Sequence, residues 1–238
     1  MVIEKSNLLA VQERDLLKSA PLLSGLPDAA RACLLEGQIP VTLERGTVLF
    51  HQGQPASQLY IVLRGWIRLY RTGVNGAEAV ISIAGPGDAV GDPGLIRPRG
   101  YLTSADAISS ARVISIDGNK LGSLMRRDPA VAVGVASALA QHVLTLTKHL
   151  EVMKLLDAKQ RTAHFLLTLC PVSSGACSLI LPYEKAVIAG WLGMKPASLS
   201  RALFRLRKHG VTVERDTVLI SDAQRLAQLS SLTRESRY

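Results

Sequence analysis

Basic side chains gather on one side of a short predicted helix near the end of the chain. At about 100° per residue, residues 196–206 form one apolar stripe, made of Leu199, Ala202, Leu203 and Leu206. The opposite side carries a largely basic set, namely Ala197, Arg201, Phe204, Arg205 and Lys208, with Ser198 and Ser200 at its margins. A guanidinium group can bind guanine N7 and O6 together, and basic groups in general bind phosphates. This face therefore has the chemistry of a DNA-contacting surface.

A second short helix must hold this one in place. Residues 185–192 are mostly small and apolar, and Gly193 follows where the chain must turn sharply. Pro196 suits the first turn of the next helix, where its missing N–H does no harm. Two helices joined in this way predict a helix-turn-helix element. The alternative at this point is an ordinary helical hairpin whose basic face is only solvated.

The positive charge is concentrated in the same part of the chain. The net charge is +9 over 238 residues. Residues 1–157 hold 16 Lys and Arg against 14 Asp and Glu, whereas residues 158–238 hold 12 against 5. A basic excess around the two-helix element is what phosphate binding requires.

Composition excludes several other classes of protein. A hydrophobic content of 47% excludes a disordered chain, and 4% aromatic residues speak against stacking on single-stranded nucleic acid. The N-terminus does not resemble a signal peptide, and no run of about 18 or more apolar residues occurs, so we expect a cytoplasmic protein without a membrane span.

The three cysteines suggest neither a disulfide framework nor a CxxC metal site, and we expect each to be a small buried residue. Cys170 and Cys177 could form a redox pair.

The first half of the chain predicts helices followed by a β domain. Residues 6–36 have a helical pattern that Pro21 and Pro27 break into pieces. From about residue 38 to 117, short β-like runs alternate with glycine turns, which predicts a sandwich, roll or barrel. Gly73 to Gly76, with Asn75 between them, predict a hairpin turn.

A long helix is predicted to begin at Asp128-Pro129 and to run to about Leu156. Its apolar residues alternate in spacings of four and three and form a heptad seam, made of Ala132, Ala136, Leu139, Val143, Leu146, Leu150 and Met153. The seam predicts the interface of a parallel dimer. The alternative is a helix that packs only on its own β domain.

The remaining segments complete a small second domain. Residues 157–170 predict another amphipathic helix, followed by a short strand. After the two-helix element come a basic two-stranded wing over residues 211–220 and a last helix that begins near Ser221-Asp222.

This order of elements resembles the Crp/Fnr family of bacterial transcription regulators across nearly the whole chain. The specific matches are GTVLFHQGQPASQLYIVLRGWIRLYR and LPYEKAVIAGWLGMKPASLSRALFRLRKHGV. The second is most similar to the branch that responds to nitrate respiration and nitric oxide (Dnr-like). The resemblance implies an α+β fold with a β-roll (jelly roll) like that of cyclic-nucleotide-binding domains. We expect a sensor domain over residues 1–127, with its roll over about 38–117, a dimerisation helix over 128–157 and a winged helix-turn-helix DNA-binding domain over 158–238.

The resemblance also indicates where an effector would bind. Cyclic-AMP binders of the family carry a Gly-Glu pair for the ribose and an Arg-Ser pair for the phosphate. Here the first pair is Gly91-Asp92 and the second falls on Tyr101-Leu102, so the phosphate-binding arginine is absent. A buried phosphodiester without its arginine would be unpaired, and we expect the effector not to be cyclic AMP. Arg97 and Arg99 lie nearby in the sequence and could bind another anion.

The sequence does not identify a cofactor. Iron–sulfur sensors of the family use an N-terminal cysteine group, and Cys33 is the only cysteine before residue 170, so we expect no cluster. Haem sensors use histidines, but Trp191 stands where some relatives place one. Haem, a redox thiol or no ligand at all stay open, with the histidine candidates His51, His142, His149, His164 and His209.

In the family's recognition helix, a Glu-x-x-x-Arg pair reads a C·G base pair and its neighbour. Arg201 matches the arginine, but Ala197 stands at the glutamate position, so the half-site should differ from the usual one. Ser200 matches a base-contacting serine of one branch. Further contacts, mainly to phosphates, are expected from Lys195, Pro196, Ser198 and Arg205.

We therefore expect a homodimeric transcription regulator, not an enzyme, that binds a near-palindromic duplex and contacts RNA polymerase. A cupin-like metal enzyme is a rival reading, but the roll offers only His51 for a metal cluster. A regulatory subunit that binds a small molecule and a protein partner is another. The missing phosphate arginine and the basic C-terminal third speak against it.

Overall fold

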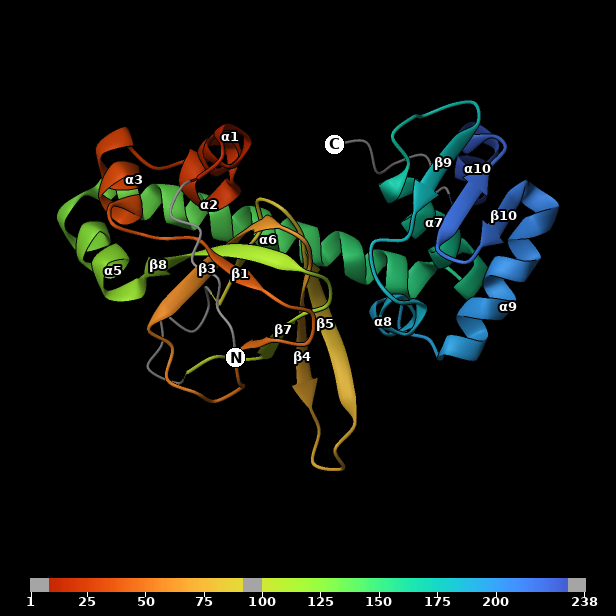
Figure 1. Ribbon diagram of the computed structural model, residues 1–238, viewed down its shortest axis with the longest axis horizontal. Coiled ribbons are helices and arrows are strands. Elements are labelled where there is room, and N and C mark those ends of the chain that lie inside the picture. Colours follow the sequence, from red (N-terminus) through yellow and green to blue (C-terminus); the bar gives the residue numbers. More distant parts are fainter. Residues whose placement is uncertain (1–8, 92–99, 231–238) are drawn as a thin grey trace. The chain divides into compact units, whose positions relative to one another are not determined.

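The computed structural model describes residues 9–91 and 100–230. The chain divides into two compact units, Met1–Leu144 and Thr145–Tyr238, and each is described by itself. Figure 1 shows the elements of both units along the chain. The first unit holds the β-roll with its flanking helices, and the second holds the two-helix element. The long helix α6 contributes to both units, because the division falls within it.

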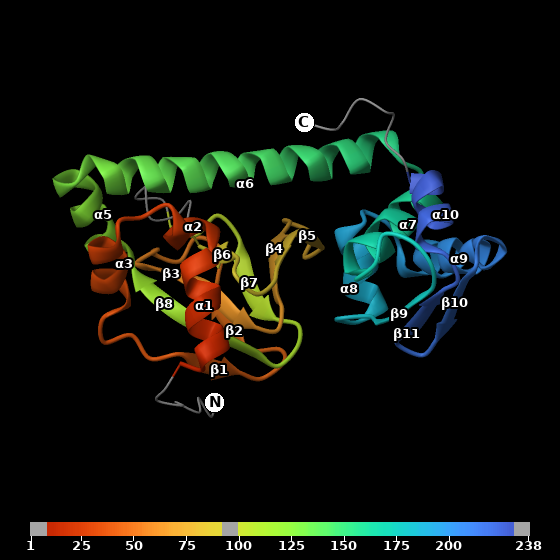
Figure 2. The same ribbon diagram turned by 90° about the horizontal axis from the view of Figure 1, so that it is seen from above.

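From residue 9 onward, three short helices precede the roll: α1 (Val11–Ser19), α2 (Pro21–Ser24) and α3 (Asp28–Leu35). Pro21 is the first residue of α2, and Pro27 is the residue immediately before α3. The two prolines therefore separate the helices, as the sequence predicts. Their buried leucines pack on the outer side of strands β3 and β8. Figure 2 shows these helices over that side of the roll.

Within the described residues, the roll has eight strands: β1 (Val41–Leu43), β2 (Val48–Phe50), β3 (Gln58–Arg64), β4 (Ile67–Thr72), β5 (Glu78–Ala84), β6 (Ala89–Val90), β7 (Ser104–Ala107) and β8 (Ala111–Asp117). They pair in two four-stranded sheets, β1-β8-β3-β6 and β2-β7-β4-β5, and all ladders are antiparallel. The predicted turn at Gly73–Gly76 joins β4 to β5, and Gly76 has φ +76° there. The two-residue strand β6 is too short to leave a pattern in the sequence.

Strand β3 separates two apolar layers. Because side chains alternate along a strand, Leu59, Ile61 and Leu63 face the helices, whereas Tyr60 and Val62 face the interior of the roll. The interior layer includes Phe50, Tyr101, Ile67 and the small residues of β7. The roll therefore has an inner core and a separate outer core beneath its helices.

Two helices follow the roll, α5 (Gly118–Arg127) and α6 (Pro129–Leu155). Asp117 caps α5 by accepting from the amides of Asn119 and Lys120, and Asp128 accepts from the amide of Ala130 at the start of α6. By length and composition alone, α6 could cross a membrane, with a mean hydropathy of 1.5 over its most apolar stretch. The sequence holds no unbroken run of 18 apolar residues there, and the helix reaches this hydropathy because its small and apolar residues outweigh the scattered polar ones.

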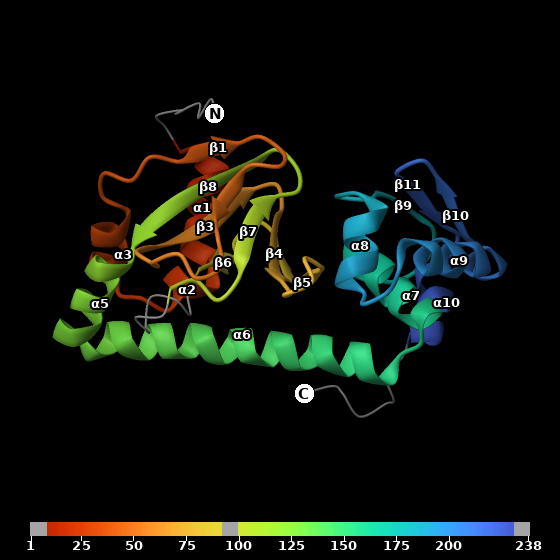
Figure 3. The same cartoon turned by 90° about the horizontal axis from the view of Figure 1, so that it is seen from below.

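The second unit has one three-stranded sheet with helices packed against it (Figure 3). Its elements are α7 (Ala158–Leu169), β9 (Cys177–Ile180), α8 (Lys185–Trp191), α9 (Pro196–Leu206), a 3₁₀ turn (Arg207–His209), β10 (Val211–Glu214), β11 (Thr217–Ile220) and α10 (Ala223–Ser230). The strand order is β10-β11-β9, so the predicted wing hairpin gains a third strand from the segment before α8.

Cys170 and Cys177 are joined by a disulfide that closes the loop between α7 and β9. The expectation of a small buried residue at each position is wrong for this pair. The sequence left a redox pair open here, and the pairing follows from the tertiary fold, because β9 returns beside the end of α7. Cys33 is a free, half-buried thiol.

Candidate DNA-binding surface

Helix α9 has the two faces that its sequence predicts. Leu199, Ala202, Leu203 and Leu206 are all buried in the core of the second unit. All five residues of the predicted opposite face are exposed, namely Ala197, Arg201, Phe204, Arg205 and Lys208. Pro196 is the first residue of the helix and Lys195 precedes it, both exposed. The apolar stripe thus fixes the helix in the unit and leaves the basic face to solvent.

The turn before α9 depends on Gly193. Its φ of +61° lies in the left-handed region that side chains disfavour. Backbone bonds tie the turn to α8, since the amide of Gly193 donates to the carbonyl of Gly190 and that of Met194 to the carbonyl of Ala189. A Cβ atom at Gly193 would collide with the methyl end of Met153 on α6. The turn is therefore tight and lies directly against the long helix.

Hydrogen bonds orient several side chains on the exposed face. A guanidinium nitrogen of Arg201 donates to the hydroxyl of Ser198 at 3.0 Å. The Ser200 hydroxyl donates to the carbonyl of Pro196 at 3.1 Å, one turn earlier in the helix. Ser198 is half-buried and serves as a support for Arg201. Arg201 is thereby held on the solvent side of the helix, next to the small side chain of Ala197.

An apolar side chain interrupts the basic face. Phe204 is 65% exposed, and the guanidinium carbon of Arg207 lies 5.2 Å from its ring centre. A cation over an aromatic face at this distance is a favourable contact. The face therefore combines basic side chains, which can bind phosphates and bases, with an exposed aromatic ring, which can make apolar contacts.

The wing is fixed next to α8. The Lys185 ammonium donates to the carbonyl of Arg215 at 2.7 Å, which ties the start of α8 to the β10–β11 turn. Arg215 has φ +56° at the tip of this turn. The wing residues 211–220 hold one basic side chain, Arg215, against Glu214 and Asp216, so the positive charge of the unit is concentrated in the two-helix element and not in the wing.

An aromatic stack that the sequence analysis did not foresee joins α6 to α8. The rings of His149 and Trp191 lie 3.7 Å apart and nearly parallel. Burial, together with the charge of His164, lowers the pKa of His149, and burial lowers the pKa of His164. Both histidines are therefore neutral near pH 7. Among the described residues, no group of three or more His, Cys, Asp or Glu side chains is arranged to hold a metal ion.

Of the residues predicted for an effector pocket, the structure brings Gly91 and Tyr101 together. Tyr101 is buried in the inner core, where its ring stacks on Phe50 at 3.8 Å and its hydroxyl donates to the carbonyl of Gln58 at 2.5 Å. Gly91 is buried beside it with φ +92°, and a Cβ atom there would lie 3.0 Å from the Tyr101 ring. Leu102 is exposed. Asp92, Arg97 and Arg99 lie outside the described residues.

The predicted dimer seam lies on α6 with uneven exposure. Val143, Leu146 and Leu150 are 58%, 39% and 56% exposed. Ala136 is also exposed, and Ala132 and Leu139 are half-buried next to the outer core of the first unit. Met153 is half-buried under the Gly193 turn. The middle of the helix therefore presents partly exposed apolar side chains at heptad spacing.

Two family models match the chain in its two units. A cyclic nucleotide-binding domain matches residues 40–128, and a Crp-like helix-turn-helix domain matches residues 160–229. The first match contains the whole roll and α5, and the second contains α8, α9 and the wing. The roll therefore corresponds to a known ligand-binding domain type, and α9 lies within a known type of DNA-binding domain.

Similar proteins span the whole chain. A solved structure of a candidate cyclic nucleotide binding protein from Ruegeria pomeroyi is 36% identical, covers 92% of this chain and 97% of its own, and superposes with a TM-score of 0.70. The CRP-like cAMP-activated global transcriptional regulator of Mycobacterium tuberculosis is 28% identical over 90% of this chain and 98% of its own. FixK2 from Bradyrhizobium japonicum shares the fold, with a TM-score of 0.72 at 22% identity over 82% of this chain and 98% of its own. With a DNA-binding element of the Crp type behind a cyclic nucleotide-binding domain, the chain belongs to the Crp/Fnr family of transcription regulators.

Proposed function

We propose that this regulator is a homodimer that binds a near-palindromic duplex site and recruits or contacts RNA polymerase in the cytoplasm. The observation that carries the proposal is the exposed basic face of α9, held by a buried apolar stripe and a glycine turn. Two copies related by a two-fold axis would present two such helices to successive major grooves, one helical turn apart. The net positive charge of the C-terminal third supplies the phosphate attraction.

The exposed middle of α6 supports the homodimer. Val143, Leu146 and Leu150 repeat at heptad spacing, so a partner helix can cover them as one stripe. Lipid is the other environment that would cover such a surface. Lys148 and Glu151 lie exposed within the same helical stretch, and His142 is exposed one turn earlier, so burying the whole circumference in a bilayer would be costly. A protein partner on one face is therefore the better account.

The filled interior of the roll supports a signal other than cyclic AMP. Tyr101 stands where cyclic-AMP binders carry the phosphate-binding arginine, and its ring fills the space beside Gly91 and Phe50. Burial raises the pKa of its phenol above the ordinary value of 10.0, so the group is neutral and cannot replace a guanidinium. The Mycobacterium tuberculosis relative is cAMP-activated, which makes this a difference that experiment must test in the present chain. The closer likeness to the nitrate and nitric-oxide responsive branch stays a prediction.

Arg201 and Ala197 are expected to set the half-site. Arg201, oriented by Ser198, can donate two hydrogen bonds to a guanine. Ala197 has no acceptor for the amino group of cytosine, so its methyl group can contact only an apolar atom such as a thymine methyl. The preferred half-site should therefore contain the guanine. It should not require a cytosine at the neighbouring position, where the family's glutamate would bind one.

Selection from a random duplex library, followed by sedimentation of the selected complex, tests the proposal. We expect an inverted repeat with a fixed guanine in each half and two chains per duplex. Arg201→Ala should weaken the selected site by about 1–3 kcal/mol and non-specific DNA much less, whereas Lys195→Ala should weaken all sequences alike and reduce the salt dependence. Ala197→Glu should restore a cytosine contact and shift the selected half-site. A single unrepeated half-site bound by one chain would refute the dimer, and an unchanged half-site for Ala197→Glu would show that residue 197 does not face the bases.

A further inference from the structure

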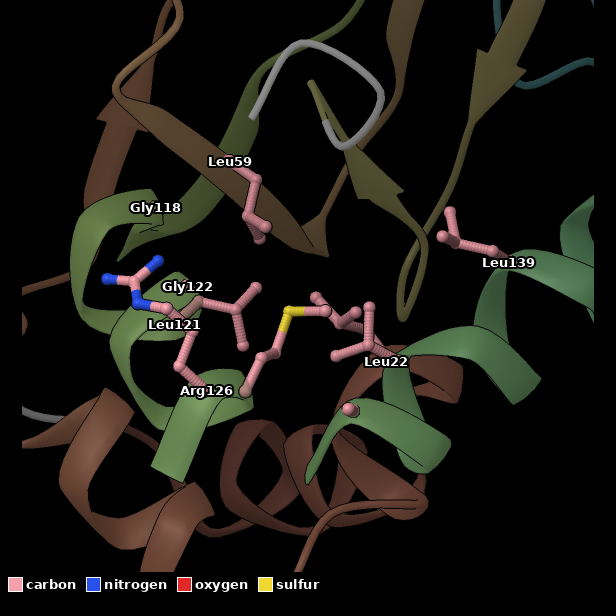
Figure 4. A pocket seen from close by; sticks show the side chains of 10 residues that line it. Leu22, Leu59, Gly118, Leu121, Gly122, Arg126 and Leu139 are labelled. Carbon is pink, nitrogen blue, oxygen red and sulfur yellow. The ribbon is translucent and has the colours of Figure 1, made fainter. Parts of the chain in front are cut away.

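A pocket of about 380 Å³ lies in the first unit, outside the roll (Figure 4). Helices α2, α5 and α6 and strand β3 form its walls. Leu59 forms part of the wall, and this side chain lies on the helix-facing side of β3, opposite Tyr60 and the inner core. The pocket is therefore separate from the place beside Gly91 and Tyr101 where a cyclic nucleotide would bind. Its volume is in the range of small-molecule sites.

The walls are apolar and already formed by one chain. Leu22, Leu59, Leu121 and Val135 are buried at the pocket, and Met125 and Leu139 complete the apolar lining. The pocket is therefore an apolar cavity that can hold an alkyl chain.

Among the described residues that line this cavity, Arg126 is the charged one. Arg126, in the last turn of α5, donates to the Ser123 hydroxyl at 3.1 Å, and among the described residues it has no carboxylate in ion-pair contact. Figure 4 shows its guanidinium group next to Gly118 and Gly122 at the rim of the pocket. A planar guanidinium group with free donors matches the two oxygens of a carboxylate. A single cation suits a singly charged head group better than a phosphate dianion.

Gly122 keeps the space beside this cation open. Glycine in a helix interior is unfavourable relative to alanine, and a Cβ atom at Gly122 would meet only a terminal nitrogen of Arg126 at 3.6 Å. The fold therefore does not require glycine at this position for backbone packing. Its effect is to leave room between the arginine head and the apolar wall, where a bound head group would lie.

We propose that this pocket binds an amphiphilic monocarboxylate, with its alkyl chain among the leucines and its carboxylate on Arg126. Such a ligand would contact Val135 and Leu139, which belong to α6. It would therefore act on the helix that we propose as the dimer interface. The binding claim itself requires neither a dimer nor DNA, so it can fail independently of the proposed function.

Calorimetric titration of the full chain with octanoate and with 1-octanol tests the proposal. We expect one octanoate per chain. Arg126→Gln should weaken octanoate by about tenfold, as the loss of one charge-assisted contact implies, and should leave 1-octanol unchanged. Arg127→Gln is the matched control, because Arg127 is the adjacent arginine, exposed like Arg126, and does not line the pocket. Equal effects of the two arginine variants would overturn the proposal, since they would indicate surface association of a surfactant only.

A second variant tests the cavity itself. Gly122→Leu should fill the space and abolish binding of both ligands, while circular dichroism shows the helix content retained, because leucine favours a helix over glycine. Wild-type binding by this folded variant would overturn the proposal. Sedimentation with and without octanoate is the last readout, and we expect an unchanged mass. If octanoate converts a dimer into monomers, the pocket belongs to the subunit interface and the proposal is wrong.

Discussion

Replacing Gly193 by alanine should measure how tightly the turn before α9 is held against the long helix. Two separate costs follow from the structure. An alanine at φ +61° adopts a left-handed conformation that costs about 1–2 kcal/mol, offset in part by the reduced entropy of the unfolded chain. The new Cβ atom also displaces the end of Met153 from its rotamer, which adds roughly 1 kcal/mol. We expect the second unit to lose about 2 kcal/mol of its free energy of unfolding.

Gly175 provides the matched control in the same unit. Its φ is +77°, but a Cβ atom there would meet nothing within 4 Å. Gly175→Ala should therefore cost only the backbone part, about 1 kcal/mol. In the Gly193→Ala background, Met153→Ala should recover the difference, because it removes the displaced side chain. The double-mutant cycle isolates this contact from the backbone strain.

Urea unfolding followed by tryptophan fluorescence is the appropriate assay. The chain has two tryptophans, and Trp191 lies in α8 next to the turn. All variants would be compared in a Trp66→Phe background, so that the signal reports the second unit alone. Equal losses for Gly193→Ala and Gly175→Ala, or no recovery on truncation of Met153, would refute the reasoning that α6 packs directly under the turn.

Four further predictions use other features. Leu146→Asp should give a monomer with weak operator binding, because a charge would enter the dimer seam; sedimentation that still shows a dimer would contradict this. Calorimetry should show no micromolar binding of cyclic AMP, since Tyr101 offers no cation to the phosphate, and a tight saturable isotherm would disprove it. The lowered pKa of His149 and His164 means that the unfolded state takes up protons first as pH falls below about 6.5, so the second unit should lose stability there; a urea midpoint independent of pH from 7.5 to 5 would exclude it. Phe204→Ala should abolish an affinity difference of about fourfold between thymine and uracil at one operator position, if the exposed ring contacts a thymine methyl; methyl-dependent binding that survives the substitution would assign that contact elsewhere.

Sequence periodicity was sufficient to predict the candidate surface. The four buried and five exposed positions of α9 and of the 3₁₀ turn after it follow from 3.6 residues per turn, and the wing and the Gly73–Gly76 hairpin follow from turn chemistry. These are local properties, and tertiary contacts agree with them. The prediction of the dimer residues rests on the same periodicity, but it needs a second chain to be tested.

Features that depend on contacts between distant segments could not be predicted in this way. The stack of His149 on Trp191 joins helices separated in sequence, and the Cys170–Cys177 bond depends on how β9 returns to α7. Strand β6 is only two residues long and exists because β3 offers it a pairing edge. The pocket near Arg126 is likewise a space between four elements, and no spacing in the sequence marks it.

Helix α6 contacts the pocket near Arg126 in the first unit and the turn before α9 in the second. In the first unit Val135 and Leu139 line the pocket near Arg126, and in the second unit Met153 lies under the glycine turn and His149 stacks on α8. A helix transmits displacement along its axis because its backbone hydrogen bonds make it stiff. If the pocket binds its ligand as we propose, we expect a change in packing at Val135 to alter the position of α6 residues under the glycine turn. Such coupling requires that an effector bind two alternative packings of α6 with different affinity.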